Sequence, residues 1–338
     1  MRRDVMKRDM MGRDMMKRRF LPLILLVAGL AVPAGTLAQT YPAKTVRLVL
    51  PFTAASAVDV LARLYGQKMT ENWGQQVLVD NRTGANGIIG MEAIAKSTPD
   101  GYTLGMGNLA TLAINPNLYA KLSYDVQRDF VPISLAATIR NCLVVHPSLP
   151  VKSVKELIAF AKARPGELNY ASGGVGSAQH IPMEMLKAMT GIDVVHVTFK
   201  GLTPAFNDVV AGQVPMIIAG VVSALPFHQT GRLRILATTG ATRTAATPEI
   251  PTVAQAGVPG YEYDSWTGFL APASTPPAVV TRVNAEAVRI GRLPDVRERL
   301  TSLGFDVIGS SPEAFAALIK DNNARIGKVI RDAGIKAE

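Results

Sequence analysis

The chain has 338 residues, of which 48% are hydrophobic and 18% are charged, and its formal net charge is +10. This length and composition allow a large buried core, which excludes a disordered chain and indicates one large or two medium globular domains. Basic residues beyond position 38 form no run and do not alternate with aromatic residues, so the sequence argues against nucleic-acid binding.

The first 38 residues differ from the rest of the chain. The basic segment MKRRF, which starts at Met16, is followed by an apolar stretch and by small residues that end at Ala38. This order predicts a secretory signal peptide over residues 1–38, cleaved after Ala38, with translation starting at Met1 or Met16. The apolar stretch is too short for a membrane anchor. Residues 1–38 carry eight basic and three acidic side chains, which leaves the mature chain a net charge of +5 and a mild attraction for small anions.

The sequence contains no pattern that predicts a cofactor. It lacks the His-Glu-x-x-His, paired-cysteine and EF-hand spacings of metal sites, and its glycines match neither a P-loop nor a dinucleotide-binding loop. Cys142 is the single cysteine, so no intramolecular disulfide can form, and its apolar neighbours predict that it is buried.

Short β-rich runs alternate with helical segments, which predicts an α/β protein with mostly parallel strands. The predicted strands cover residues 44–52, 75–82, 102–108, 141–147, 168–172, 193–199 and 214–220. The predicted helices cover residues 58–69, 85–99, 153–166, 177–191, 203–212, 275–292, 293–304 and 311–334. Because the pattern restarts near residue 141 without a flexible linker, we expect two lobes, 39–140 plus 262–338 and 141–261, with a ligand cleft between them.

Three predicted loops lead from a strand into a helix: residues 51–59, 173–180 (GGVGSAQH) and 199–206. In open α/β sheets this edge binds ligands, and the free amides at a helix N-terminus favour a carboxylate by roughly 0.3 to 2 kcal/mol. The glycines of the second loop permit close approach of the backbone to a ligand. Ser177 either caps the following helix or donates its hydroxyl to the ligand.

The pair Ser177 and His180 also raises the alternative of an exported serine hydrolase, with Ser177 or Ser172 as nucleophile. However, the loop lacks the Gly-x-Ser-x-Gly elbow, and two residues three apart on one helix would not present nucleophile and base to one carbonyl. We therefore interpret His180 as a residue that hydrogen-bonds across the loop, and we expect no enzymatic activity.

Segments along nearly the whole mature chain resemble one family. They include YPAKTVRLVLPF, DNRTGANGIIG, STPDGYTLGMGN, YASGGVGSAQH, IPTVAQAGVPGYE and SWTGFLAPASTPPAVVTRVNAE. The chain is similar to the periplasmic substrate-binding proteins of tripartite tricarboxylate transporters, the Bug or TctC-like family. The resemblance implies a two-lobed, periplasmic-binding-protein-like fold of type II, a carboxylate held between the lobes, delivery to membrane permease subunits, and a monomer. A ligand-sensing subunit for a signalling receptor is the other reading of the same resemblance.

Carried over position by position, the family's ligand contacts fall on four regions of this chain and on one further position, Ala219. The residues concerned are Phe52, Thr53, Ala54, Ala55, Ser56, Asp59, Asn108, Ala110, Ser172, Gly174, Val175, Gly176, Ser177, His180, Thr198, Lys200, Gly201 and Ala219. Lys200 either attracts the acid or is a solvated loop residue.

The sequence departs from the family pattern at three places: in the first loop, after the late strand, and at Thr198-Phe199, where the family has Pro-Tyr before Lys-Gly. Ala55 and Ser56 replace two glycines of the first loop, and Ala219-Gly220 replaces an acidic residue that commonly follows the late strand. The second change points to plain carboxylates or aromatic acids rather than amino acids, whose ammonium group needs an acidic partner. Asp59 matches the family, and we expect it to hold the first loop in shape rather than to contact an anion.

Overall fold

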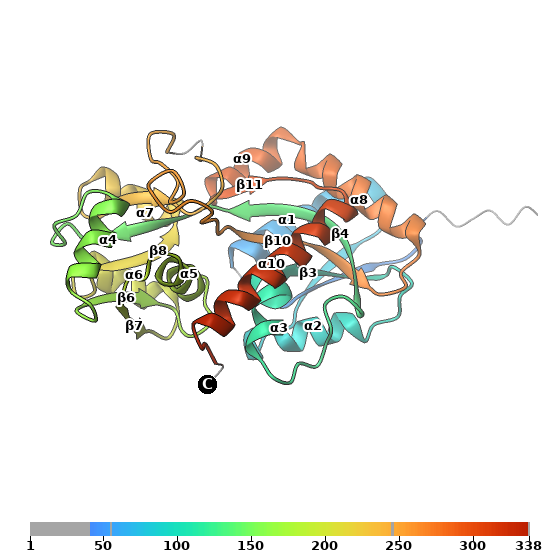
Figure 1. Ribbon diagram of the computed structural model, residues 1–338. Coiled ribbons are helices and arrows are strands. Elements are labelled where there is room, and N and C mark those ends of the chain that lie inside the picture. Colours follow the sequence, from blue (N-terminus) through green and yellow to red (C-terminus); the bar gives the residue numbers. More distant parts are fainter. Residues whose placement is uncertain (1–40, 55, 245–246, 337–338) are drawn as a thin grey trace, which may run out of the picture. The chain divides into compact units, whose positions relative to one another are not determined.

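The structure is a computed structural model that describes residues 41–54, 56–244 and 247–336, which belong to one compact unit (Figure 1). The predicted signal peptide and Ala55 lie outside the described residues. The strands are β1 Val46–Leu50, β2 Val77–Asn81, β3 Thr103–Asn108, β4 Phe130–Ile139, β5 Asn141–Val145, β6 Leu168–Ser172, β7 Val194–Thr198, β8 Met216–Gly220, β9 Arg234–Thr238, β10 Ser265–Pro272 and β11 Phe305–Val307. The α-helices are α1 Ala57–Trp73, α2 Ile88–Ala95, α3 Asn115–Leu118, α4 Val154–Ala163, α5 His180–Thr190, α6 Leu202–Val210, α7 Val221–Gln229, α8 Pro277–Gly291, α9 Pro294–Ser302 and α10 Pro312–Asp332. A 3-10 turn, η1 (Ala85–Gly87), precedes α2, and a π-helix, η2 (Ala110–Ile114), precedes α3.

The first lobe is the six-stranded sheet, in the order β11-β4-β10-β3-β1-β2, with the helices packed on it. Successive residues of a strand point to opposite faces, so Leu48 and Leu50 of β1 join one apolar cluster and Val49 joins another. The first face is covered by α1, α8 and α9, and the second by α2, η2, α3 and α10. The helical stripe predicted for residues 58–69 is confirmed, because its Leu61, Ala62, Tyr65 and Met69 are buried.

The second lobe is the five-stranded sheet, in the order β7-β6-β8-β5-β9, with α4 to α7. The same alternation places Met216 and Ile218 of β8 on the face with α4 and α5, and Ile217 and Ala219 on the face with α6 and α7. Cys142 lies within the latter cluster and is fully buried, as predicted. Figure 1 shows this lobe on the left and the first lobe on the right.

The prediction of mostly parallel strands is wrong. β1 pairs in parallel with β2 and β3, and β6 with β7 and β8, but β10 is antiparallel to β3 and β4, β11 to β4, and β5 to β8 and β9. The strands that run against the others of their sheet are β10 and β11 in the first sheet and β5 in the second. β4 leads out of the first sheet and β10 leads back into it, so the two necessarily run in opposite directions.

The two sheets are connected through short segments. Arg140 alone separates β4 from β5, and the return path runs from Thr238 to Ser265. Arg140 forms ion pairs with Asp264, on the return path, and with Asp306 of β11. The predicted lobe boundaries near residues 140 and 262 agree with the division of strands between the sheets, and they stay a prediction as domain limits.

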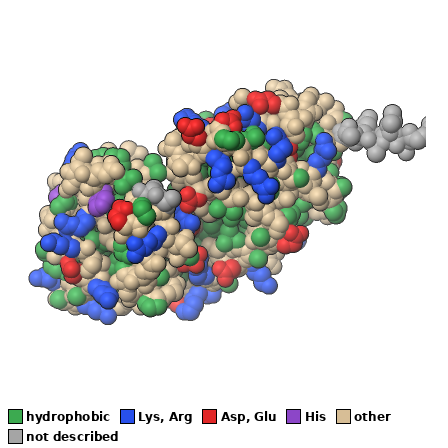
Figure 2. Space-filling model, turned by 90° about the horizontal axis from the view of Figure 1, so that it is seen from above, with side chains coloured by type: hydrophobic (Ala, Val, Ile, Leu, Met, Phe, Trp, Pro, Cys, Tyr) green, Lys and Arg blue, Asp and Glu red, His purple; other side chains and the backbone are tan. Residues whose placement is uncertain are grey.

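Two further features concern the surface charge and the hydrophobicity of the helices. On the face that Figure 2 shows, Lys and Arg side chains are interspersed with Asp and Glu. Within residues 41–54, 56–244 and 247–336, every helix is too short or too polar to cross a membrane.

Candidate ligand-binding site

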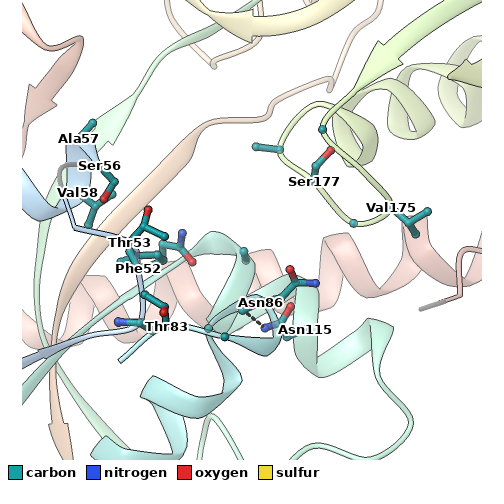
Figure 3. A pocket seen from close by; sticks show the side chains of 18 residues that line it. Phe52, Thr53, Ser56, Ala57, Val58, Thr83, Asn86, Asn115, Val175 and Ser177 are labelled. Carbon is teal, nitrogen blue, oxygen red and sulfur yellow. Dashed lines mark hydrogen bonds between the residues drawn. The ribbon is translucent and has the colours of Figure 1, made fainter. Parts of the chain in front are cut away.

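A cavity of about 460 Å³ lies between the two lobes, beside the ends of strands from both sheets. Figure 3 shows Thr53, Ser56, Asn86 and Asn115 of the first lobe on one side and Val175 and Ser177 of the second lobe on the other. The residues that line it are Pro51, Phe52, Thr53, Ser56, Ala57, Val58, Thr83, Gly84, Asn86, Gly87, Asn108, Ala110, Asn115, Gly173, Val175, Gly176, Ser177 and Ala178. The structure therefore brings the first and second loops to one cavity.

The first loop, residues 51–59, ends in a capped helix. Ser56 is the N-cap of α1, and its Oγ accepts a hydrogen bond from the Asp59 amide over 3.2 Å. Ala57 and Val58, the first two residues of α1, line the cavity. Because the first amides of a helix have no partner within that helix, this end of α1 offers donors and partial positive charge to a ligand.

A further loop, residues 83–87 between β2 and α2, contributes polar groups that the sequence analysis did not assign to the site. Asn86 has a left-handed backbone with φ 52°, and its side chain donates to Tyr119 Oη over 2.6 Å. The Asn115 side chain donates to the carbonyl oxygen of Asn86 over 3.0 Å. Gly87 has φ 86°, and a Cβ there would lie 2.8 Å from Thr111 Cγ2, so a glycine is required where this loop packs on η2.

The loop after β3 begins with a reciprocal pair of hydrogen bonds. Asn108 Oδ1 accepts from the Thr111 amide, and Thr111 Oγ1 accepts from the Asn108 amide, each over 3.0 Å. Thr111 is the second residue of the π-helix η2, a rare element that often occurs at functional sites. Asn108 and Ala110 line the cavity.

The second loop, which we call the glycine loop and define as residues 172–178, has a network of its own. The Gly174 amide donates to Ser172 Oγ over 3.1 Å, and the Gly176 amide donates to His180 Nδ1 over 3.1 Å. The latter bond is the contact across the loop that we expected of His180. Ser177 is not the N-cap, which is Gln179, but its Oγ accepts from the His180 amide over 3.2 Å.

The third loop, residues 199–206, supports the glycine loop from behind. A Cβ added to Gly173 would lie 3.0 Å from the carbonyl carbon of Gly201 and 3.0 Å from the Leu202 amide nitrogen. Two backbones therefore meet at Gly173, where no side chain fits. Thr198, Lys200 and Gly201 do not line the cavity.

The cavity presents neutral hydrogen-bonding groups. None of the described residues that line it has a formally charged side chain. Its donors are hydroxyls, carboxamides and backbone amides, which can hold an anion without transferring a proton to it. In the described part of the chain, no group of three or more His, Cys, Asp or Glu residues could hold a metal ion.

A second cavity of about 270 Å³ adjoins the first, and Ala57 and Ala178 line both. Its other lining residues are Ile139, Arg140, Asn141, Gln179, Leu202, Gly220, Val222, Ser223, Ser265, Leu303 and Gly304. This chamber contains Gly220, the N-cap of α7.

Eight of the eighteen predicted site residues line the first cavity: Phe52, Thr53, Ser56, Asn108, Ala110, Val175, Gly176 and Ser177. Nine others lie elsewhere: Ala54, Asp59, Ser172, Gly174, His180, Thr198, Lys200, Gly201 and Ala219. Of these nine, Asp59, Ser172, His180 and Ala219 are buried. Ala55 lies outside the described residues.

Outside the predicted loops, four of the five lining residues that were missed lie in the loop 83–87. A signal for them is present in the sequence: the segment TGANG directly follows the strand at 75–82, which is rich in β-formers. β2 is parallel to β1, so the loops after both strands leave from the same edge of the sheet. That reasoning, applied to the second strand as it was to the first, would have placed Asn86 at the cavity.

Two α/β lobes with a cavity between them define a solute-binding protein with the type II fold of periplasmic binding proteins. The model of the tripartite tricarboxylate transporter family receptor, TctC, matches residues 61–335. The chain therefore belongs to the TctC receptor family, whose members are substrate-binding proteins rather than enzymes.

Individual relatives agree with this assignment. The chain is 38% identical over 319 residues to a protein encoded in the tcbD-tcbE intergenic region of Pseudomonas sp. strain P51, covering 92% of this chain and 95% of that protein. Among solved structures, it is similar to R. palustris Rpa4515 with adipate, with 37% identity, a TM-score of 0.75, and coverage of 88% of this chain and 99% of that one. It is also similar to MatC from Rhodopseudomonas palustris with bound malate, with 31% identity, a TM-score of 0.72, and coverage of 86% and 100%.

Proposed function

We propose that the protein captures a small carboxylate between its lobes in the periplasm and delivers it to the permease subunits of a tripartite tricarboxylate transporter. The observation that carries this proposal is the cavity of about 460 Å³, which residues of both lobes line with neutral hydrogen-bond donors. The related structures that contain adipate and malate support an organic acid as the class of ligand. Export through a signal peptide cleaved after Ala38 is part of the same proposal.

The carboxylate is held by donors from both lobes. The amides at the start of α1, at Ala57 and Val58, favour its negative charge by about 0.3–1 kcal/mol. The hydroxyls of Thr53 and Ser56 approach from the first lobe, and Ser177 approaches from the second. Since no acidic side chain is among the described lining residues, an ammonium group would lack a partner, and plain acids are favoured over amino acids.

Thermal unfolding and titration calorimetry with adipate, malate, benzoate and aspartate test the binding. An acid that binds should raise the melting temperature by mass action, which amounts to about 2.7 kcal/mol of stabilisation at a hundred times Kd. We expect a micromolar or tighter Kd, about 8 kcal/mol of binding free energy, for at least one of the plain acids. Val175→Trp, which fills the cavity, should abolish the effect, whereas Val195→Trp at an exposed position on β7 should not. A panel without any effect contradicts the proposal.

Uptake measurements test delivery. Cells that lack this protein should lose uptake of the labelled acid that binds in vitro, and the Val195→Trp protein, but not the Val175→Trp protein, should restore it. If the acid binds and uptake does not depend on the protein, the transport part is wrong and a ligand-sensing role replaces it. Sequencing the N-terminus of the exported protein should give Gln39 as the first residue.

A further inference from the structure

Three aromatic rings are stacked behind the glycine loop. His180, at the start of α5, lies 4.1 Å from His196 of β7 between ring centroids, with 9° between the ring planes. The His196 ring is also stacked on Tyr170 of β6, with 4.8 Å between centroids and 10° between planes. None of the three rings lines the ligand cavity, and Tyr170 and His180 are buried. The stack therefore acts on a ligand only through the loop in front of it.

His180 fixes the amide of Gly176. Its Nδ1 accepts the hydrogen bond from that amide over 3.1 Å. A ring nitrogen accepts a hydrogen bond only when it carries no proton, so His180 is neutral here, with its proton on Nε2. Gly176 lines the cavity, and its backbone is left-handed with φ 75°.

His196 fixes Gly174 through Ser172. His196 Nε2 is hydrogen-bonded to Ser172 Oγ, which also accepts from the Gly174 amide over 3.1 Å and lies 3.2 Å from the Gly174 carbonyl oxygen. One arrangement of protons satisfies all three contacts: His196 donates from Nε2, and the Ser172 hydroxyl donates to the carbonyl of Gly174. Each histidine thus holds one glycine of the loop.

The surroundings keep His180 uncharged. Burial lowers the pKa of His180 to about 4; His196 on β7 and Lys187 on α5 lower it as well, and Glu184 on α5 opposes them. Glu184 is already engaged, because it accepts hydrogen bonds from Tyr170 Oη over 2.6 Å and from Lys187 Nζ over 2.8 Å. These groups, with the Tyr170 phenol of β6, are the titratable and charged neighbours of the ring.

We propose that His180, in its neutral form, and His196 are positioning residues that hold Gly176 and Gly174 in the conformation that binds the ligand. Glycine residues have the greatest backbone freedom, so a loop rich in them binds weakly unless other contacts order it beforehand. Protonation of His180 places a donor opposite the Gly176 amide, which releases the loop. The consequence for ligand affinity rests on the proposed function, whereas the consequence for the loop does not.

Two substitutions of His180 separate the hydrogen bond from the stack. Asn in His180→Asn can accept from the Gly176 amide through Oδ1 but cannot titrate, and Phe in His180→Phe keeps an aromatic ring but has no acceptor. With adipate as the probe at pH 7, His180→Asn should bind within threefold of the wild type, and His180→Phe should bind at least tenfold more weakly. His146→Asn, whose ring bonds Ser148 away from the loop, is the control and should bind like the wild type.

The pH profile adds a readout that a merely structural residue would not change. The ratio of wild-type affinity to His180→Asn affinity should be constant from pH 8 to 6 and fall about twofold at pH 4, because the titration of adipate cancels in the ratio. A flat ratio down to pH 4, or equal binding by both His180 variants, overturns the proposal.

Nuclear magnetic resonance of the ligand-free protein tests the effect of His180 on the glycine loop even if adipate does not bind. At pH 7 the ring nitrogens of His180 should report a proton on Nε2, and those of His196 should do the same. The Gly176 amide should exchange slowly with solvent in the wild type and His180→Asn, and at least tenfold faster in His180→Phe. A proton on Nδ1 of His180, or equal exchange in all three proteins, contradicts the positioning role, whereas failure of adipate alone counts only against adipate as the ligand.

Discussion

Asn81, the last residue of β2, donates a hydrogen bond from its side chain to Asp59 Oδ1 over 2.8 Å. The same Nδ2 group donates to the carbonyl oxygen of Phe52 over 3.1 Å. Asp59 is buried and also accepts from Arg63 Nε over 2.9 Å. The charge of the Asp59 carboxylate is thus neutralised by Arg63 of the same helix. Through Asn81, this carboxylate is linked to the Phe52 carbonyl, so both ends of the first loop are held together. This is the shape-holding role expected for Asp59, reached through a residue that the sequence analysis had not connected to it.

Asn81→Ala should therefore loosen the first loop. The substitution leaves Asp59 Oδ1 and the Phe52 carbonyl without this donor, which should cost about 1–3 kcal/mol of unfolding free energy in urea titrations. It should also weaken carboxylate binding severalfold, because the start of α1 is no longer fixed. Asn207→Ala, at an exposed position on α6, is the control and should change neither quantity. Equal stability of the Asn81 and Asn207 variants would show that the bond does not matter.

Gly176→Ala should disturb the cavity from the other lobe. Alanine is strained at φ 75°, and its Cβ would lie 2.7 Å from Leu118 Cδ2 of α3. Gly191→Ala is a matched control, because Gly191 has φ 69° with no atom near the added Cβ. We expect the control to lose about 1–2 kcal/mol of stability from backbone strain alone, and Gly176→Ala to lose more.

Calorimetry and a double-mutant cycle check this difference. Adding Leu118→Ala to Gly176→Ala should cost less stability than Leu118→Ala alone, because the contact between the two side chains disappears. Carboxylate affinity should fall for Gly176→Ala and stay unchanged for Gly191→Ala. Additive effects of the two substitutions would rule out the contact.

Arg140→Met should destabilise the connection between the lobes. The side chain is only 20% exposed and pairs with Asp264 and Asp306. Removing it leaves a buried carboxylate without its cation, which costs about 3–5 kcal/mol at neutral pH. Asp264→Asn in the same protein should restore part of the loss, since no charge then has to be buried. Urea unfolding of the single and double variants measures both effects.

The loss of stability in Arg140→Met should also depend on pH. Burial raises the pKa of Asp264 to about 6. The positive charge of Arg140 lowers this pKa, and the negative charge of Glu262 raises it further. A carboxyl group whose pKa is raised by folding contributes stability below its unfolded pKa, about 3.9, and this contribution is lost as pH rises through the folded value. The deficit of Arg140→Met should therefore be larger at pH 8 than at pH 4.5. A deficit that does not change with pH would assign the effect to packing rather than charge.

Gly220→Asp should add an acidic side chain to the second cavity. Gly220 is the N-cap of α7 with extended backbone (φ −61°), and a Cβ there meets only Ser223 Oγ, at 3.9 Å. Aspartate and asparagine both cap helices well, and glycine at the N-cap is only slightly worse. Either variant should therefore gain at most about a few tenths of a kcal/mol of stability. Only Gly220→Asp adds a negative charge, so it should bind plain carboxylates more weakly than Gly220→Asn does. Equal affinities, measured by calorimetry, would mean that the ligand lies far from this chamber.

The helices with local signals could be predicted from the sequence. Ser153 and Ser311, the first residues of two predicted helices, are N-caps, and each side-chain oxygen accepts from an amide three residues later over 3.2 Å. The helix predicted over 85–99 is shorter, because Asn86 and Gly87 adopt left-handed backbone that starts α2 at Ile88 and because α2 ends at Ala95. Capping residues and periodicity thus predicted helices reliably, whereas the first residue of a helix that follows a glycine-rich segment was not predicted.

Elements defined by distant partners escaped the sequence analysis. The strands β4, β9, β10 and β11 were not assigned, and α7 was missed because Pro226 lies inside it, where proline normally interrupts a helix. The antiparallel pairing of β10 with β4 depends on residues more than a hundred positions apart, such as Ser265 and Ile139. Eight of the eighteen residues that line the cavity were expected from the sequence. Asn86 was missed although the strand before it carries a signal, and Asn115 was missed because tertiary packing alone brings it to the cavity.

Arg140 has a mechanical consequence as the sole residue between β4 and β5. A single residue contributes two soft backbone torsions, so on this side the lobes can turn about a point but cannot slide past one another. A change in either torsion would therefore move Ser177, in the second lobe, relative to Ser56, in the first lobe. Capture and release of a solute would then depend in part on the stiffness of one arginine and its two acidic partners.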